Sequence, residues 1–358
     1  MRIGLIDADM MWRSRANGRR YGKSKADVYP NLALMKISAW HKSAGDLVEW
    51  YNPVDGWYDE VYISKVFSDT PESREFIHAN RVIRGGTGYQ IYLEDGKEDF
   101  VDDRFAIEHG CRMTYDAWNE MTVWTDDDGF LFWVELPEEI EHIMPDYSIY
   151  PMVKDTAFGF LTRGCPRGCG FCHVAGKEGR RSYKVADLKE WWSGQKNIVL
   201  MDPNILASKD CIDLLQQLAD SKAKVDINQG IDARLLTEEK MEVLKQVKLK
   251  TIHFAWDDYR QKDAVLRGLR LFADMYGKAL DKGHQAQVFV LVNFDTTLEQ
   301  DLERVYTLRD MGYDAYIMVY DKQHAAPVYK SLQRWCNNRA IFHKIPKFED
   351  YDRRKAKE

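Results

Sequence analysis

From residue 155 onward, short apolar segments alternate with longer amphipathic ones, and this rhythm restricts the possible folds more than any other feature. The apolar segments have the length of strands, and the segments between them have the length of helices. We predict strands at 156–161, 197–201, 224–228, 251–255, 287–292 and 315–320, and helices at 185–192, 209–219, 238–247, 261–280 and 298–311. Such a repeat builds a parallel sheet, so the expected fold class is α/β. Over residues 151–325 we expect a partial (β/α)6 TIM-type barrel, whose chemistry lies on loops at the carboxyl ends of the strands.

The first ninety residues predict a second, smaller α/β unit. Strands are expected at 3–6, 47–51, 61–66 and 81–84, with a helix at 32–40. This pattern indicates an N-terminal Rossmann-like domain with a parallel sheet over residues 1–93. No G-x-G-x-x-G sequence follows the first strand, so dinucleotide binding has no support. We interpret Gly85-Gly86-Thr87-Gly88 as a turn rather than a phosphate cradle.

Between these parts, residues 94–150 form an acidic insertion and linker. Residues 94–146 hold seventeen Asp/Glu and three Lys/Arg, which is typical of a solvated surface. Aromatic residues on either side of Asp126-Asp127-Asp128-Gly129 predict a β-hairpin over 115–134. Residues 326–358 are expected to form a C-terminal helical extension and a basic tail.

The charge of the chain is unevenly distributed. The net charge of −6 argues against a general polyanion binder, although residues 10–29 hold six Lys/Arg against one Asp. Residues 321–358 hold ten Lys/Arg and five Asp/Glu. The 45 % apolar content excludes a mostly disordered chain. No apolar run reaches the ~18–20 residues of a membrane span, and the first residues do not resemble a signal peptide, so we expect a cytoplasmic protein without membrane partners.

Three of the six cysteines lie within eight positions, directly after the first strand of the predicted barrel. They are Cys165, Cys169 and Cys172, spaced C-x3-C-x2-C on a loop that also contains Gly164, Gly168 and Gly170. Thiolates are the usual ligands of iron–sulfur clusters, which normally take four, and only three are local here. The spacing therefore predicts a cluster with one iron left open to a substrate or cofactor.

Two other interpretations of the cysteines compete with this one. A structural zinc site would need His173 or a distant cysteine as fourth ligand, but His173 adjoins Cys172 and no second C-x-x-C occurs. A non-catalytic iron–sulfur protein that transfers electrons would also need a fourth ligand. Cys111, Cys211 and Cys336 stand alone in the sequence, as small buried residues do.

The cysteine motif resembles that of the radical S-adenosylmethionine superfamily, which has an aromatic residue before the last cysteine, here Phe171. The resemblance covers residues 151–325, and the preceding α/β domain is similar to the cobalamin-binding-type and methylthiotransferase-like branch. It implies that Cys165, Cys169 and Cys172 hold a 4Fe–4S cluster that binds S-adenosylmethionine and cleaves it reductively. The 5′-deoxyadenosyl radical then abstracts a hydrogen atom from a substrate. A flavodoxin or ferredoxin is implied as electron donor.

The resemblance also implies cofactor-binding roles for residues at the ends of the predicted strands. Phe171 is expected near the adenine, and Asp202 near the methionyl amino group. Arg234 is expected to meet the methionyl carboxylate, Asp257 the ribose hydroxyls, and Asn293 the adenine side. A helix N-cap or a loop hydrogen bond is the alternative for each polar residue, particularly for Asp295 to Thr297 before the last long helix.

The sequence departs from that branch at two points. The first strand is followed by Asp7-Ala8-Asp9-Met10-Met11-Trp12, without the histidine that can ligate cobalt, so cobalamin is not supported. Only Cys111 precedes the motif, which disfavours a second cluster. The sequence leaves the substrate open between a nucleotide or RNA and a peptide or small metabolite.

Overall fold

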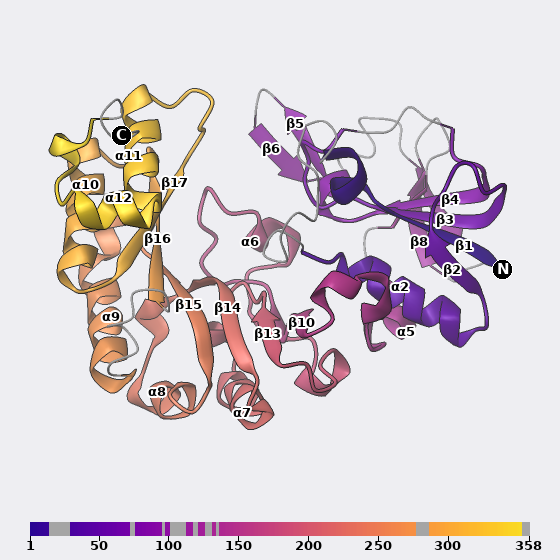
Figure 1. The fold of residues 1–358 in the computed structure, drawn as a ribbon, viewed down its shortest axis with the longest axis horizontal. Helices are drawn as coiled ribbons and strands as arrows, with labels where there is room; N and C mark the ends of the chain where they lie inside the picture. Colours follow the sequence, from indigo (N-terminus) through magenta and orange to yellow (C-terminus); the bar gives the residue numbers. More distant parts are fainter. Residues whose placement is uncertain are drawn as a thin grey trace. The chain divides into compact units, whose positions relative to one another are not determined.

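The computed structural model describes residues 1–13, 29–71, 76–94, 97–100, 112–116, 121–125, 131–133, 136–276 and 286–352. Its contacts divide the chain into two compact units, coloured from indigo to yellow along the sequence in Figure 1. The first contains Met1–Phe158 with Lys189–Ser193, and the second contains Gly159–Leu188 with Gly194–Glu358. Most of the basic segment 10–29, Cys111, the predicted turn at 126–129 and the end of the tail lie outside the described residues.

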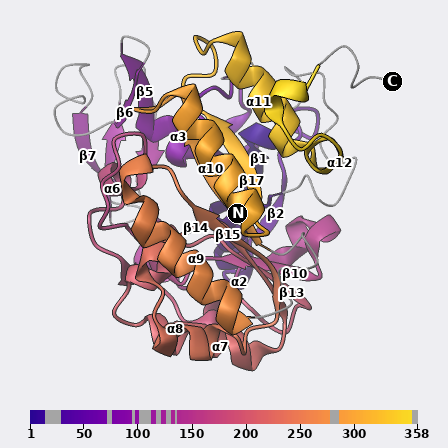
Figure 2. The same ribbon diagram turned by 90° about the vertical axis from the view of Figure 1, so that its left-hand side faces the viewer.

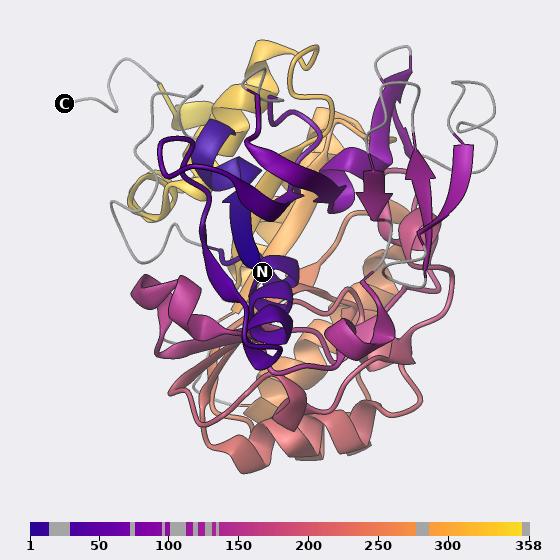
Figure 3. The same cartoon turned by 90° about the vertical axis from the view of Figure 1, so that its right-hand side faces the viewer.

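The first unit is built on a seven-stranded sheet in the order β2-β1-β3-β4-β9-β8-β7. Strands β2, β1, β3, β4 and β9 pair in parallel, which confirms the predicted parallel sheet, and Figure 3 shows them from another direction. The remaining pairs, β9 with β8 and β8 with β7, are antiparallel. The bounds are β1 (Arg2–Asp7), β2 (Leu47–Trp50), β3 (Tyr58–Ser64), β4 (Ala79–Gly85), β7 (Arg112–Asp116), β8 (Met121–Thr125) and β9 (Leu131–Trp133).

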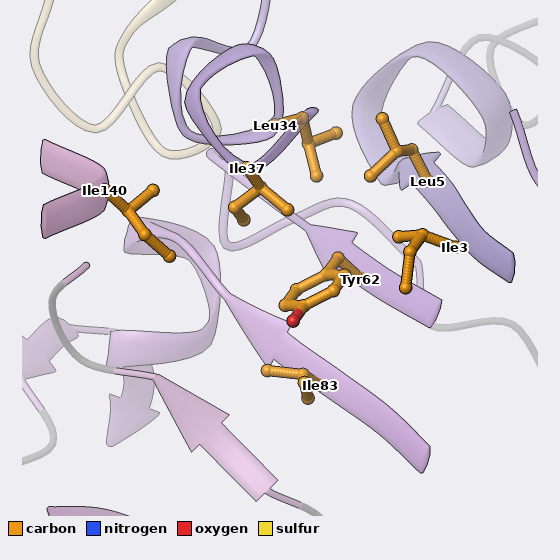
Figure 4. Packing of buried hydrophobic residues seen from close by; sticks show 7 residues of the cluster. All are labelled: Ile3, Leu5, Leu34, Ile37, Tyr62, Ile83 and Ile140. Carbon is orange, nitrogen blue, oxygen red and sulfur yellow. The ribbon is translucent and has the colours of Figure 1, made fainter. Parts of the chain in front are cut away.

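The alternating side chains of β1 and β3 supply cores to both faces of this sheet. On one face, Ile3 and Leu5 pack with Tyr62 and with Leu34 of helix α2 (Leu32–Ser43), as Figure 4 shows. On the other face lies a cluster of Ile6, Ala8, Tyr51, Tyr58, Val61 and Ile63. Because successive strand residues point to opposite faces, near-continuous apolar strands are what a sheet covered on both sides requires.

Helix α2 begins at its cap, Asn31. The Asn31 side chain accepts a hydrogen bond from the Leu34 N–H at 3.2 Å and donates one to the Ser64 hydroxyl at 2.7 Å. The cap therefore starts the helix and ties it to the carboxyl end of β3. The shorter elements of this unit are α3 (Thr87–Gln90), α5 (Glu138–Glu141) and the antiparallel pair β5 (Ile91–Glu94) and β6 (Lys97–Phe100).

The predicted hairpin over 115–134 is confirmed in its strands. In the antiparallel pairing register, Trp124 of β8 is the partner of Phe132 of β9, and Thr125 is the partner of Leu131. The structure adds two features that the sequence analysis did not predict. Strand β7 extends the hairpin to three strands, and β9 joins it in parallel to β4, so the acidic segment continues the first sheet.

The second sheet contains six strands in the order β10-β13-β14-β15-β16-β17, and the four pairs from β13 to β17 are parallel. Figure 2 shows α9 and α10 in front of this sheet. The strands are β10 (Thr156–Gly159), β13 (Asn197–Leu200), β14 (Lys224–Ile231), β15 (Leu249–Ala255), β16 (Ala286–Val292) and β17 (Asp314–Val319). The helices are α7 (Cys211–Ser221), α8 (Glu238–Leu244), α9 (Lys262–Tyr276), α10 (Leu298–Asp310), α11 (Pro327–Asn337) and α12 (Arg339–Lys344).

The expected TIM-type barrel is observed only as an open sheet, since the strand order shows no pairing between β10 and β17. At the β17 edge, side chains of α11 form hydrogen bonds with backbone groups that would otherwise pair with another strand. The Ile317 N–H donates to Asn337 Oδ1 at 2.7 Å, and the Ile317 carbonyl accepts from Gln333 at 3.1 Å. The helical extension predicted after residue 325 therefore covers a sheet edge.

One predicted helix is wrong. Residues 185–192 contain only a 3-10 turn at Leu188–Glu190. The side chain of Gln217 explains the short turn, because it bonds the Leu188 N–H at 2.9 Å and the Asp187 carboxylate at 2.7 Å. Gly194, with φ +100°, follows closely. Among the described residues, no helix has both the length and the apolar character needed to cross a bilayer.

Candidate functional site

The three cysteines lie on a loop closed by a short antiparallel pair, β11 (Thr162–Arg163) and β12 (Tyr183–Lys184). The loop also contains the single-turn helix α6 (Val174–Lys177). Gly164 has φ +75°, and a Cβ there would lie 2.2 Å from the Arg181 carbonyl oxygen. Only glycine fits this position, so the two ends of the loop can come together beside Cys165. The Cys165 N–H donates to the Gly179 carbonyl at 3.1 Å.

Cys165, Cys169 and Cys172 line one pocket of about 760 Å³ in the second unit. The same pocket is lined by residues that follow β14, β15 and β16, because the carboxyl ends of parallel strands meet at one edge of the sheet. Of the eight predicted site residues, Phe171, Arg234 and Asp257 join the three cysteines there, whereas Asp202 and Asn293 are not among the lining residues. Cys211 and Cys336 are buried and do not line it either.

Arg234 is held by a carboxylate that the sequence analysis did not select. Its Nε lies 2.7 Å from Asp232 Oδ1, and its guanidinium bonds Asp232 Oδ2 at 3.1 Å. Arg167, on the cysteine loop, donates to the same carboxylate at 2.6 Å. Asp232 also caps the 3-10 turn Ala233–Leu235. One buried carboxylate thus links the cysteine loop to the end of β14 and orients Arg234 in the pocket.

Asp257 is held by hydrogen bonding between neighbouring strand ends. Its Oδ1 accepts from the Leu291 N–H of β16 at 2.9 Å. Burial raises the pKa of Asp257 to about 6, although that hydrogen bond and the charges of Arg304 and Arg234 act in the opposite direction. Asp257 therefore changes charge close to neutral pH.

Behind Asp257, the fully buried Arg304 of α10 fixes the ends of β15 and β16. It donates to the carbonyls of Trp256 at 2.6 Å, Asp257 at 3.0 Å and Leu291 at 2.7 Å. Its charge is balanced by Asp301, one turn away at 2.5 Å. The sequence contained a signal for this pair, since an Asp and an Arg at i and i+3 share the buried face of the helix.

Asp202 lies beneath the cysteine loop and is fully engaged with the backbone there. Its two oxygens accept from the Leu161 N–H at 2.7 Å, the Thr162 N–H at 2.8 Å and the Thr162 hydroxyl at 2.7 Å. Burial nevertheless raises its pKa to about 7. In this structure Asp202 anchors the start of the loop.

Asn293 has φ +65° and donates from its side chain to the Tyr320 carbonyl at 3.1 Å. The next residue, Phe294, lines the pocket and packs edge-on against Phe171, with ring centroids 5.3 Å apart. Thr297 caps α10 and forms a capping box with Gln300, which confirms the N-cap interpretation of this segment.

Within the described residues, no group of three or more His, Cys, Asp or Glu side chains is arranged around a single metal position. Thiolates that hold a polynuclear cluster bind different irons and do not need to converge on one point. Burial raises the pKa of the Cys169 and Cys172 thiols, and the neighbouring thiols and Asp257 act in the same direction.

No protein-family model and no curated protein sequence matches the chain. Among solved structures, a similar chain is SuiB of Streptococcus suis, whose structure was determined with S-adenosylmethionine bound. The two chains are 13 % identical and superpose with a TM-score of 0.37. The superposition covers 67 % of this chain and 57 % of SuiB, so this chain spans less than two thirds of that protein. A likeness at this level carries no conclusion about fold or activity.

Proposed function

We propose that this chain is a radical S-adenosylmethionine enzyme, in which Cys165, Cys169 and Cys172 hold a 4Fe–4S cluster beside a cofactor pocket. One observation carries the proposal: three cysteines spaced C-x3-C-x2-C line the same pocket as Arg234, Asp257 and Phe171. The donor set fits such a cluster, since three thiolates leave one iron available to a cofactor. When bound, the cluster supplies one electron to the sulfonium of S-adenosylmethionine, which yields methionine and a 5′-deoxyadenosyl radical.

The residues of the chain bind and orient the cofactor. Arg234 stays charged and is oriented by Asp232, so it presents a guanidinium to the methionyl carboxylate. Asp257 accepts hydrogen bonds from the ribose hydroxyls. Phe171 and Phe294 form an aromatic wall against which the adenine packs. Asp202 and Asn293 support this pocket from below and beside it, through the backbone contacts described above.

We further propose that the open sheet is a partial (β/α)6 barrel of that superfamily and that the first unit is a Rossmann-like domain of the same branch. The reductant is a small electron-transfer protein such as flavodoxin or ferredoxin. The proposal does not include cobalamin, because the segment Asp7–Trp12 after the first strand has no histidine to ligate cobalt.

The proposal is tested by anaerobic reconstitution of the full chain with iron and sulfide. Absorption and electron paramagnetic resonance spectra report the cluster, and chromatography measures 5′-deoxyadenosine after addition of S-adenosylmethionine and dithionite. We expect a brown protein that cleaves the cofactor. Cys169→Ala should lose both properties, whereas Cys211→Ala, which removes a thiol outside the pocket, should retain both.

Each other outcome assigns a different function. A brown protein that does not cleave the cofactor would be an iron–sulfur electron carrier. A colourless protein that retains zinc would be an interaction module. Cofactor cleavage that survives Cys169→Ala would show that the cluster has other ligands.

A further inference from the structure

The face of the six-stranded sheet opposite helix α9 carries polar and aromatic side chains that the cofactor pocket does not use. On β16, Val288, Val290 and Val292 are fully buried on the helix side, whereas Phe289 is only half-buried. On β17, Tyr316 remains 40 % exposed. This open face is defined by Asp226, Thr251, His253, Phe289 and Tyr316.

Three aromatic rings of the open face form a row across β15, β16 and β17. His253 stacks on Phe289 with centroids 5.0 Å apart and planes at 18°, and Phe289 meets Tyr316 edge-on at 5.7 Å. The row starts next to the cofactor pocket. Gly230 lines that pocket, and a Cβ on it would lie 3.4 Å from the Phe289 ring. A ligand stacked on this row can therefore reach the pocket.

The polar groups of the open face are mainly acceptors. The pairing of β14 with β15 is irregular between Ile227 and Gly230, and the Ile227 carbonyl accepts from His253 Nδ1 at 2.9 Å. A carbonyl cannot donate, so Nδ1 carries the hydrogen of this bond. Asp226 Oδ1 and Thr251 Oγ1 are buried and lack a hydrogen-bond partner among the described residues. His253 Nδ1 lies 4.0 Å from Asp226 Oδ1, too far for a hydrogen bond. Buried groups of this kind indicate a missing ligand or water.

We propose that the open face binds a nucleobase that carries an amino group, as the substrate of the proposed radical enzyme. A flat ring stacks on the His253–Phe289–Tyr316 row, and its N–H groups donate to Asp226 and Thr251. Adenine, guanine and cytosine have such amino groups, whereas uracil in a nucleotide has no amino group and a single ring N–H. That this ligand is the substrate rests on the proposed function, whereas its binding to the open face does not.

The arginine side chain of a peptide would also stack on aromatic rings and pair with a carboxylate. Two cations on the cysteine loop favour the nucleotide. Arg180 and Arg181 are exposed on the cysteine loop, and neither has an ion-pair partner in the described part of the chain. Two unpaired cations attract the phosphate of a nucleotide and repel a peptide guanidinium.

The test is binding of the four ribonucleoside 5′-monophosphates and of a mixed-sequence single-stranded RNA to the full chain, measured by calorimetry without cluster or S-adenosylmethionine. We expect the three amino-bearing bases to bind at least about fivefold more tightly than uracil. Asp226→Asn should weaken their binding about tenfold, because it removes the charge and half of the acceptor capacity. Asp220→Asn, an exposed control on α7, should not change it. Tighter binding of RNA than of mononucleotides would identify a nucleic-acid strand as the source of the base.

Several outcomes would overturn the inference: no nucleotide or RNA binding, equal binding of uracil, or equal binding by Asp226→Asn. Displacement of the nucleotide by excess S-adenosylmethionine would place it in the cofactor pocket instead. If a Gly-Arg-Gly peptide displaces the nucleotide, and if the peptide no longer binds to Asp226→Asn, the open face is a peptide site. Because the protein is tested without cluster, nucleotide binding is judged separately from cofactor cleavage. The uracil comparison uses the unaltered chain and does not depend on the folding of a variant.

Discussion

At the scale of single residues, the structure places carboxyl groups in buried positions at strand ends, where their charge is costly. Burial raises the pKa of Asp7 and Asp257 to about 6 and that of Asp202 to about 7. Each accepts hydrogen bonds that favour the carboxylate, so the cost of desolvation exceeds the gain from those bonds. Such groups bind a proton more strongly in the folded chain than in the unfolded chain.

The proton linkage of Asp7 gives a testable pH dependence. Its oxygens accept from the Tyr150 hydroxyl at 2.7 Å and the Met10 N–H at 3.0 Å. Because the folded pKa lies above the unfolded value of 3.8, the free energy of unfolding decreases as the pH rises from about 4 to about 6 and then levels off. The full effect is about 3 kcal/mol, at 1.36 kcal/mol per pKa unit.

Asp7→Asn should remove that dependence. The amide stays neutral and can still bond Met10 and Tyr150 if the phenol hydroxyl rotates. We expect the variant to be more stable than the natural chain at pH 7.5 by about 3 kcal/mol, with the difference vanishing near pH 4. Urea unfolding from pH 4 to 8 measures it. The exposed Asp55→Asn serves as control and should follow the natural chain. A variant that is less stable at pH 7.5 would show that Asp7 is needed as a carboxylate.

At the scale of elements, close contacts between a helix and a strand end shape the pocket. Gly268 lies in α9, where a Cβ would be 1.9 Å from the Ala233 carbonyl oxygen. The 3-10 turn that begins at Ala233 carries Arg234. The absence of a side chain at 268 therefore lets α9 pack directly against the turn that presents Arg234 to the pocket.

Gly268→Ala should destabilise the chain, although alanine favours a helix by about 1 kcal/mol over glycine. The added methyl group must push α9 away from the turn, and overpacking of this kind costs about 1–3 kcal/mol. Thermal unfolding measures the change. Arg267→Ala, at the adjacent exposed position, is the control and should have little effect. An unchanged or raised melting temperature in Gly268→Ala would mean that the helix and the turn are not in contact.

The same contacts explain what the sequence could and could not predict. Strands and helices were predictable because their periodicity is local. The lining of one pocket by Cys165, Arg234 and Asp257 was predictable because each residue closely follows a strand end. The role of Asp202 beneath the loop depends on Leu161 and Thr162, forty residues away in the chain. Asp232 was overlooked because its partner Arg167 lies 65 residues away in the chain. Helix 185–192 was predicted from a local pattern that the Gln217 side chain overrides.

At the scale of the whole molecule, both large sheets end at an edge that must not pair with another chain. The second sheet solves this problem with α11. Asn337 accepts from the Ile317 N–H at 2.7 Å and donates to the Ile317 carbonyl at 3.0 Å, so its amide replaces the backbone of a neighbouring strand. Cys336 adds a bond from its thiol to the Ala315 carbonyl. The helix thus satisfies the edge of β17 without extending the sheet.

Asn337→Leu should expose this edge. The variant leaves the Ile317 N–H without its partner, which costs about 1–3 kcal/mol, and frees the strand to pair with a second copy. We expect a lower melting temperature and concentration-dependent association, measured by light scattering after size-exclusion chromatography. Asn338→Leu is a matched control, because the Asn338 side chain caps α12 by accepting from the Ile341 N–H. The hydrogen bonds to Ile317 of β17 come from Asn337 and not from Asn338. It should lose stability without associating. If both variants associate equally, apolar exposure and not the strand edge causes the association.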